Sequence, residues 1–353
     1  MRFVANVQRV SALQVCLLAC CVLLAGVGLN TASASSSGFD GPIGIAFSGS
    51  NAWVTNADNS SITEFDASTG AIVRVVTAAA AELKDPWAIA ISGSRMWVSN
   101  IAYHSVSELN ASNGSLIAIT QEYDAPSAIA VNKAHVWVVD CGSICSGSYG
   151  GTGNAVTELD AVNGTYVRTI NSLSDELNGS SAAVLSGTHL WIANENSSIT
   201  ELNASNGSLV RVIKAWANSD GPVAIAASGT HVWMTDAWTN SVAEFNASNG
   251  SRVRIVNSAP DQLDEPNAIL VTGSHVWIAD CGTSNTCPSG GGSVTELNSS
   301  NGSLVRTISS SAGKIHGPTS IEANGRAVWI VNSDNNSVSE LNASNGSLIR
   351  VIR

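Results

Sequence analysis

Charged side chains are scarce in this chain and make up 12% of its 353 residues. Positive charge is the scarcer sign, with 16 Lys and Arg against 27 Asp and Glu and a net charge of −11 at pH 7. Phosphate backbones repel such a surface, so the composition argues against nucleic acid as a partner. Ser, Asn, Thr, Gly and Ala are abundant instead, which is typical of a neutral-polar exterior over a β-sheet core.

Acidic residues are absent from the first part of the chain, where none precedes Asp40. Arg2 and Arg9 supply positive charge, residues 10–29 are mostly apolar, and 32–34 read Ala-Ser-Ala. A positive start, an apolar run and a small-x-small site together are typical of a cleaved signal peptide.

We therefore predict a cleaved signal peptide over 1–34, a short polar lead-in over 35–40, and a secreted or extracytoplasmic location without a membrane span after processing. A retained membrane anchor is the alternative, since the apolar run is near the lower length limit for a spanning helix. A lipoprotein at Cys20 is a second alternative, although apolar residues continue directly after it.

Cysteine is also rare after residue 34. The four that remain form two close pairs: Cys141 with Cys145, and Cys281 with Cys287. In an oxidising compartment an even number of closely paired cysteines predicts two local disulfides. A single four-cysteine zinc site is the alternative, but it requires the two pairs to meet.

Repetition is the strongest signal in the remaining sequence. One tryptophan recurs every 40 to 54 residues, at Trp53, Trp97, Trp137, Trp191, Trp233, Trp277 and Trp329. An Asx-x-x-x-Gly turn follows each one, beginning at Asp66, Asn110, Asp160, Asn203, Asn246, Asn298 and Asn342. Sevenfold self-similarity at this period indicates a radial repeat architecture.

One repeat contains four short β-strands. In the fifth, residues 222–226 are apolar and begin with proline, 231–236 are β-rich around a tryptophan, 241–245 alternate, and 251–256 follow a tight Asn-to-Gly turn. Four short antiparallel strands cannot bury both faces alone, whereas seven such sheets packed radially can. We predict an all-β fold, a seven-bladed β-propeller of four-stranded antiparallel blades over 41–353, monomeric and with no strand exchanged between the first and last blades.

The recurring residues are predicted to be scaffold. The tryptophans suit packing between blades, and an Asx three residues after each one suits loop capping. A Glu on the third strand and, in six repeats, an Arg on the fourth predict cross-strand ion pairs. His135, His189, His231 and His275 precede four of the tryptophans by two residues and are predicted to be polar strand starts.

Function is expected where the repeats depart from one another. In a propeller, the loops between second and third strands share one face with the loops between blades, and binding residues concentrate on such variable loops. The non-repeating aromatic and histidine residues of these loops are candidate ligand-binding residues: Trp87, Tyr103, His104, Tyr149, Trp216, Trp238 and His316. Aromatic rings suit a carbohydrate or peptide ligand through stacking and hydrogen bonds; the alternative is that they fill gaps between blades.

Glu322 is a further candidate. The corresponding innermost-strand positions hold apolar residues, namely Ala46, Ala90, Ala130, Val184, Ala226 and Leu270. A lone carboxylate near the central channel suits cation binding or general-base catalysis. The alternative is a carboxylate that is simply hydrated there.

The repeats resemble a known group of propellers. Residues 88–91, 96–100 and 105–110 are similar to the repeats of YVTN/YncE-like, NHL and streptogramin-lyase-like propellers, and the turn at 66–70 is similar to that of quinoprotein-type repeats. These superfamilies contain binding modules, lyases and lactone hydrolases. Resemblance to streptogramin lyases implies a magnesium ion and a general-base histidine in a His/Glu cluster; here the available histidines are His104 and His316, without a His-x-Glu pair.

The predicted function is therefore that of an exported, non-catalytic module that binds a protein or carbohydrate ligand through its loop-bearing face. We predict no cofactor and no resident metal. The alternative is a metal-assisted lyase or hydrolase that uses Glu322, His104 or His316.

Overall fold

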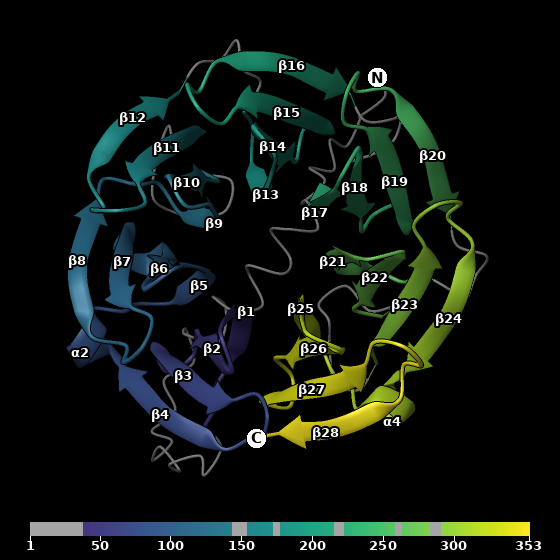
Figure 1. The fold of residues 1–353 in the computed structure, drawn as a ribbon, viewed down its shortest axis with the longest axis horizontal. Helices are drawn as coiled ribbons and strands as arrows, with labels where there is room; N and C mark the ends of the chain where they lie inside the picture. Colours follow the sequence, from purple (N-terminus) through teal and green to yellow (C-terminus); the bar gives the residue numbers. More distant parts are fainter. Residues whose placement is uncertain (1–37, 143–153, 172–176, 215–221, 258–262, 283–290) are drawn as a thin grey trace, which may run out of the picture.

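The computed structural model describes residues 38–142, 154–171, 177–214, 222–257, 263–282 and 291–353. Seven four-stranded antiparallel sheets are arranged radially around a centre, each with the first strand innermost and the fourth at the rim (Figure 1). The predicted seven-bladed β-propeller is confirmed.

Each blade consists of four strands that are consecutive in the sequence. Blade 1 contains β1 (Pro42–Ser48), β2 (Asn51–Asn56), β3 (Ser61–Asp66) and β4 (Ile72–Thr77), and blade 2 contains β5 (Pro86–Ser92), β6 (Arg95–Asn100), β7 (Ser105–Asn110) and β8 (Leu116–Gln121). Blade 3 contains β9 (Pro126–Val131), β10 (His135–Asp140), β11 (Ala155–Asp160) and β12 (Tyr166–Ile170), and blade 4 contains β13 (Ser180–Ser186), β14 (His189–Asn194), β15 (Ser198–Asn203) and β16 (Leu209–Lys214). Blade 5 contains β17 (Pro222–Ser228), β18 (His231–Asp236), β19 (Ser241–Asn246) and β20 (Arg252–Asn257). Blade 6 contains β21 (Pro266–Thr272), β22 (His275–Asp280), β23 (Ser293–Asn298) and β24 (Leu304–Ser309). Blade 7 contains β25 (Pro318–Asn324), β26 (Ala327–Asn332), β27 (Ser337–Asn342) and β28 (Leu348–Ile352). Short helical segments are α2 (Ala78–Ala81), η2 (Ile101–Tyr103) and α4 (Ser310–Gly313).

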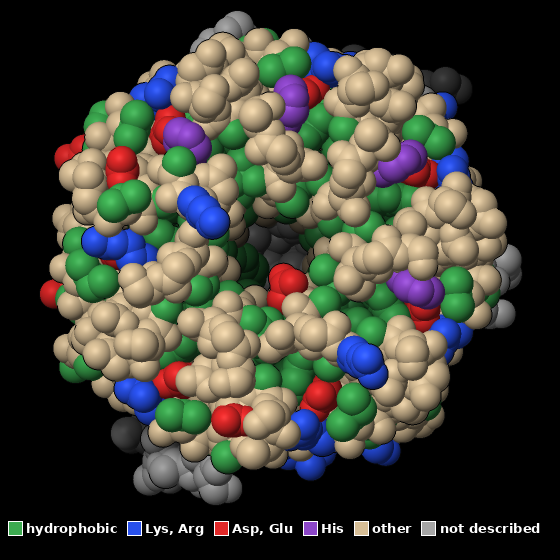
Figure 2. All heavy atoms as spheres, viewed as in Figure 1, with side chains coloured by type: hydrophobic (Ala, Val, Ile, Leu, Met, Phe, Trp, Pro, Cys, Tyr) green, Lys and Arg blue, Asp and Glu red, His purple; other side chains and the backbone are tan. Residues whose placement is uncertain are grey.

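The two ends of the blades form two different faces. The tight turns that join first to second strands and third to fourth strands lie on one face, which we call the hairpin face and which Figure 2 shows. The connections between second and third strands and those between blades lie on the other, which we call the loop face. Each innermost strand therefore runs from the loop face, where its proline or serine begins it, toward the hairpin face.

The tryptophans pack between neighbouring blades. Trp53 of blade 1 is fully buried and joins an apolar cluster with Met96 and Leu109 of blade 2. Its indole Nε1 donates to the carbonyl of Ala111 at 3.1 Å, also in blade 2. All seven repeat tryptophans are at most 1% exposed, which confirms the scaffold prediction.

The Asx after the tryptophan of blade 1 holds a loop and a strand at once. Asn56 accepts from the backbone N–H of Asp40 at 3.3 Å, in the segment that enters the first blade. Its amide Nδ2 donates to Ser61 Oγ at 3.0 Å and Thr63 Oγ1 at 2.9 Å on the third strand. The predicted capping role is confirmed, and the donation to strand hydroxyls is an addition that the sequence analysis missed.

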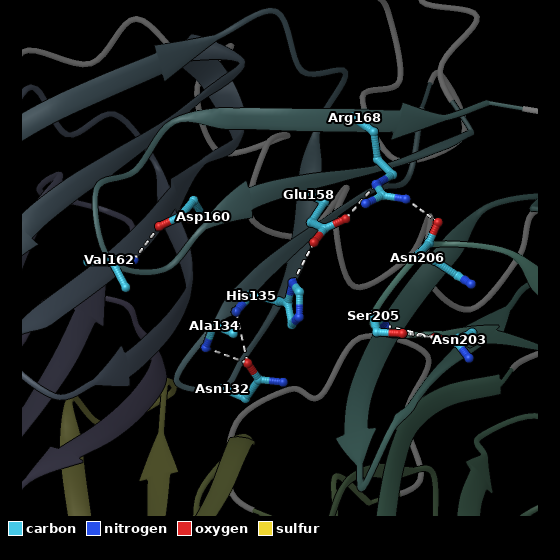
Figure 3. A network of polar contacts seen from close by, with 10 residues as sticks. All are labelled: Asn132, Ala134, His135, Glu158, Asp160, Val162, Arg168, Asn203, Ser205 and Asn206. Carbon is cyan, nitrogen blue, oxygen red and sulfur yellow. Dashed lines mark hydrogen bonds and ion pairs between the residues drawn. The ribbon is translucent and has the colours of Figure 1, made fainter.

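The Glu–Arg pairs extend beyond one blade (Figure 3). Glu158 Oε2 lies 2.7 Å from Arg168 Nε across the β11–β12 hairpin, as predicted. The same guanidinium donates to the carbonyl of Asn206 in the next blade, and His135 Nδ1 contacts the second oxygen of Glu158. This interpretation of the histidine was incomplete: instead of being only a polar strand start, it partners a buried carboxylate.

Among the residues that the structure describes, the ring closes without strand exchange between the first and last blades, as predicted. Phe39, which precedes β1, is fully buried in a cluster with Phe65 of blade 1 and Trp329 of blade 7. Across the same boundary, Thr319 Oγ1 donates to the carbonyl of Ile43 at 2.9 Å. Packing and side-chain hydrogen bonds thus join the first and last blades.

Candidate functional site

Trp238 is the most prominent aromatic residue of the loop face. It lies in the β18–β19 connection and is 50% exposed. The turn that carries it is held by Asp236, whose Oδ1 accepts from the backbone N–H of Thr239 at 2.9 Å, and Thr239 in turn contacts the Ser241 hydroxyl at 2.7 Å. The indole is therefore presented to solvent on a turn fixed at both ends.

Tyr103 occupies the corresponding connection of blade 2. It ends η2 and is 57% exposed. The next residue, His104, has a left-handed backbone with φ of +51°, and its N–H donates to the Ile101 carbonyl at 3.3 Å. Two predicted ligand-binding aromatic residues are thus exposed on the loop face, in blades 2 and 5.

His104 faces the boundary between blades 2 and 3. Its Nδ1 accepts from the backbone N–H of Ala125 at 3.4 Å and lies 4.0 Å from Asp124 Oδ1. An imidazole in this position stabilises the blade boundary, and its ring is about one third exposed.

Trp87 and His316 lie where they take part in the packing and capping of the scaffold. Trp87 is partly buried and packs against Ile101, Ala125 and Cys141 between blades. The backbone N–H of His316 donates to Asn332 Oδ1 at 3.1 Å, so the residue belongs to the capped segment that enters blade 7. The contacts of Trp87 agree with the alternative stated for the loop aromatic residues, that they fill gaps between blades.

Glu322 lies apart from these residues. It is in β25 opposite Trp329 of β26 and lines a cavity in the hairpin-face half of the central channel. It follows Pro318 by four positions, roughly 13 Å along an extended strand from the loop-face end. The candidates of the alternative enzyme hypothesis are therefore divided, with both histidines on loop-face segments and the glutamate toward the opposite face.

Two buried aspartates stand out that the sequence analysis treated only as loop caps. Burial raises the pKa of Asp140 and that of Asp280 to about 8 in each case. Asp280 Oδ2 accepts from Thr295 Oγ1 at 2.7 Å and from Ser293 Oγ at 3.3 Å. The sequence feature that could have identified these two residues is an Asp in place of the Asn that four other blades carry at this position.

These aspartates directly precede the first cysteine of each predicted pair. Cys141 and Cys281 are buried, whereas Cys145 and Cys287 lie outside the described residues. The two disulfides therefore stay a prediction. Tyr149 and Trp216, two predicted ligand-binding residues, also lie outside the described residues.

In the described part of the chain, no three or more His, Cys, Asp or Glu side chains are grouped so that they could hold a metal ion. In the same ranges, no helix has the length and apolar character that crossing a membrane requires.

Comparisons with known proteins identify the fold. No protein-family model matches the sequence, and no curated protein does. Among solved structures, the chain is similar to hydrazine synthase of Kuenenia stuttgartiensis, with a TM-score of 0.70 and 18% identity over 89% of this chain and 99% of that one. It is also similar to a streptogramin B lyase (TM-score 0.65, 16% identity, 86% and 94% covered) and to BamB from Moraxella catarrhalis (0.54, 16%, 84% and 81%). At such identities the likeness concerns the fold.

Proposed function

For this seven-bladed β-propeller, we propose the function of an exported, non-catalytic module that binds a protein or glycan ligand through its loop face. The fold itself is shared by binding modules and by some enzymes, so the argument rests on the side chains of that face. The predicted signal peptide supports export.

The exposure of Trp238 carries the proposal. Trp238 lies on a connecting loop with half of its surface exposed to water, which leaves a large apolar area unburied. The turn around it is already fixed by Asp236 and Thr239, so a ligand that stacks on the indole loses little side-chain or loop entropy on binding. Exposed aromatic rings with an apolar face and a polar edge suit sugars and peptides.

The alternative lyase or hydrolase has weaker support. His104 is directed at Asp124 and Ala125, and Glu322 lines the other half of the channel. A general base and an electrophilic partner need to converge within hydrogen-bond reach of one substrate. We therefore favour binding without turnover.

A glycan and peptide array tests the proposal. We expect wild-type protein to bind a defined subset of spots and the Trp238→Ala variant to lose most of that binding, with an unchanged melting temperature. Tyr166→Ala is the matched control, because Tyr166 is 62% exposed but lies on the outer strand β12 instead of the loop face. Equal binding by the Trp238 variant, or loss in the Tyr166 variant alone, contradicts the proposal.

A further inference from the structure

The central channel contains a second potential binding site, on the side opposite the proposed ligand face. Its hairpin-face half holds a cavity of about 400 Å³, lined by the innermost strands of blades 1, 2, 3, 4 and 7. Figure 2 shows the hollow at the centre of this face, with hydrophobic side chains around it. A cavity of this size lies within the range of small-molecule sites.

The side chains of the lining residues are apolar with one exception. Ile45, Phe47, Ile89, Ile129 and Leu185 are among the lining residues. The innermost strands are also the inner edges of their sheets, so unpaired backbone N–H and C=O groups border the channel as well. Glu322 is the one ionisable residue among the described residues of the lining. No lysine, arginine or histidine of the described lining faces it.

Glu322 has few hydrogen-bond partners among the described residues. Its Oε1 accepts from the backbone N–H of Ala323 at 3.0 Å. Within the described residues, Oε2 accepts no hydrogen bond from the protein, and Glu322 is one of the residues that line the cavity. Burial raises the pKa of this carboxyl, which indicates that the surroundings do not compensate its charge.

The scaffold has no evident need for a carboxylate here. The equivalent position of every other blade is apolar, and in each case it pairs with the repeat tryptophan as Glu322 pairs with Trp329. Burying a carboxyl without a full set of partners opposes folding. When a residue lowers stability and lines a cavity, its presence is best explained by binding to a ligand in that cavity.

We propose that this cavity binds a small organic cation, a primary ammonium group on a short aliphatic chain, with Glu322 as its counter-ion. An ionised carboxylate can only accept hydrogen bonds, and an ammonium offers three N–H donors. The lining side chains suit a short alkyl chain, and backbone carbonyls at the edges of the innermost strands offer further acceptors for the ammonium. The net charge of −11 favours entry of cations over anions.

Titration calorimetry with n-hexylammonium, at neutral pH and low salt, tests this site. Hexan-1-ol serves as the uncharged probe of the same length. We expect wild-type protein to bind the ammonium more tightly than the alcohol and Glu322→Gln to weaken ammonium binding by roughly tenfold to a hundredfold, as for loss of a charge-assisted hydrogen bond. Alcohol binding should change little.

Two further variants separate charge from space. Glu82→Gln removes an exposed carboxylate with the same change in net charge and should leave ammonium binding unchanged. Ala90→Leu introduces into blade 2 the residue that blade 6 carries at the equivalent position, Leu270, and should reduce binding of both probes by filling the cavity. Ammonium binding at wild-type affinity in Glu322→Gln or in Ala90→Leu overturns the proposal. So does a wild-type protein that binds the ammonium no more tightly than the alcohol.

The melting temperature gives a second readout. Because Glu322 opposes folding, Glu322→Gln should melt at the same temperature as wild type or higher, which a structural role would not produce. This site does not depend on the loop face. Failure of the array experiment leaves it standing, and its own failure leaves the loop-face proposal standing.

Discussion

Arg254 and Ser300 are 46 residues apart in the sequence and belong to neighbouring blades, yet Arg254 Nη2 donates to the Ser300 carbonyl at 3.0 Å. The Nε of the same guanidinium lies 2.6 Å from Oε2 of Glu244, whose side chain has no exposed surface. One arginine thus compensates a buried carboxylate and joins blade 5 to blade 6. Equivalent contacts to the next blade are made by Arg74, Arg168, Arg211 and Arg306.

Replacing Arg254 by alanine should destabilise the protein. Burial already raises the pKa of Glu244, and Arg254 is the largest influence that lowers it. Without the guanidinium, the carboxylate stays buried beside His231 alone, and we expect the free energy of unfolding to fall by about 1–3 kcal/mol. Urea unfolding followed by tryptophan fluorescence measures the change.

Arg252 offers the matched control for that variant. It lies two positions earlier on the same strand and is exposed. Arg252→Ala should change the free energy of unfolding by less than about 0.5 kcal/mol. Equal effects of the two substitutions would show that the buried ion pair contributes nothing beyond general surface charge.

Replacing Asp280 by asparagine should change how stability depends on pH. Burial raises the pKa of Asp280 from 3.8 to about 8, so the folded protein holds a proton that the unfolded chain releases near pH 4. The wild-type contribution is therefore most favourable below pH 4 and declines as pH rises toward 8. Asp280→Asn removes this decline, because an amide does not ionise and can donate to Thr295 as Asn56 donates to Thr63.

The measurement is the melting temperature at pH 5 and at pH 8. We expect the variant to gain stability relative to wild type at pH 8 and to differ less at pH 5. Asp66→Asn is the control, since hydrogen bonds from Ser68 and Thr69 lower the pKa of that exposed carboxyl, and its protonation falls below this pH range. A parallel shift of wild type and Asp280→Asn at both pH values would mean that Asp280 does not titrate in this window.

The cysteine prediction has a direct chemical test. Purified protein unfolded in iodoacetamide without reductant should remain unmodified at Cys141, Cys145, Cys281 and Cys287, and the same sample after reduction should be modified at all four. Peptide mapping should link each cysteine to its near neighbour, because the two pairs follow β10 and β22 in blades 3 and 6. Alkylation before reduction, or a link between the two pairs, would contradict local disulfides.

The repeat period was enough to predict the blades. The tryptophan recurs because each blade boundary needs the same large apolar side chain, and the Asx-to-Gly turn recurs because its backbone needs a left-handed residue. Gly70 has φ of +78° and donates its N–H to the Asp66 carbonyl at 2.7 Å. A requirement repeated seven times leaves a visible pattern.

The candidate site was less predictable. Glu322 was noticed because it departs from six apolar equivalents, but its separation from His104 and His316 depends on strand direction relative to the two faces. The contacts of the strand-start histidines with buried glutamates, such as His189 with Glu201 at 2.7 Å, depend on side-chain direction that spacing alone does not reveal. The raised pKa of Asp280 likewise follows from burial and not from its sequence neighbours.

The way in which the ring closes has a consequence for how the chain can be rearranged. Because every sheet is built from one uninterrupted stretch, the natural joint between β28 and β1 is equivalent in kind to the six boundaries that the backbone crosses. A circular permutant that starts at blade 2 and finishes with blade 1 would contain the same seven sheets, with a short linker between residues 353 and 38. The same modularity allows whole units to be copied or exchanged without splitting any sheet between the two ends of a gene.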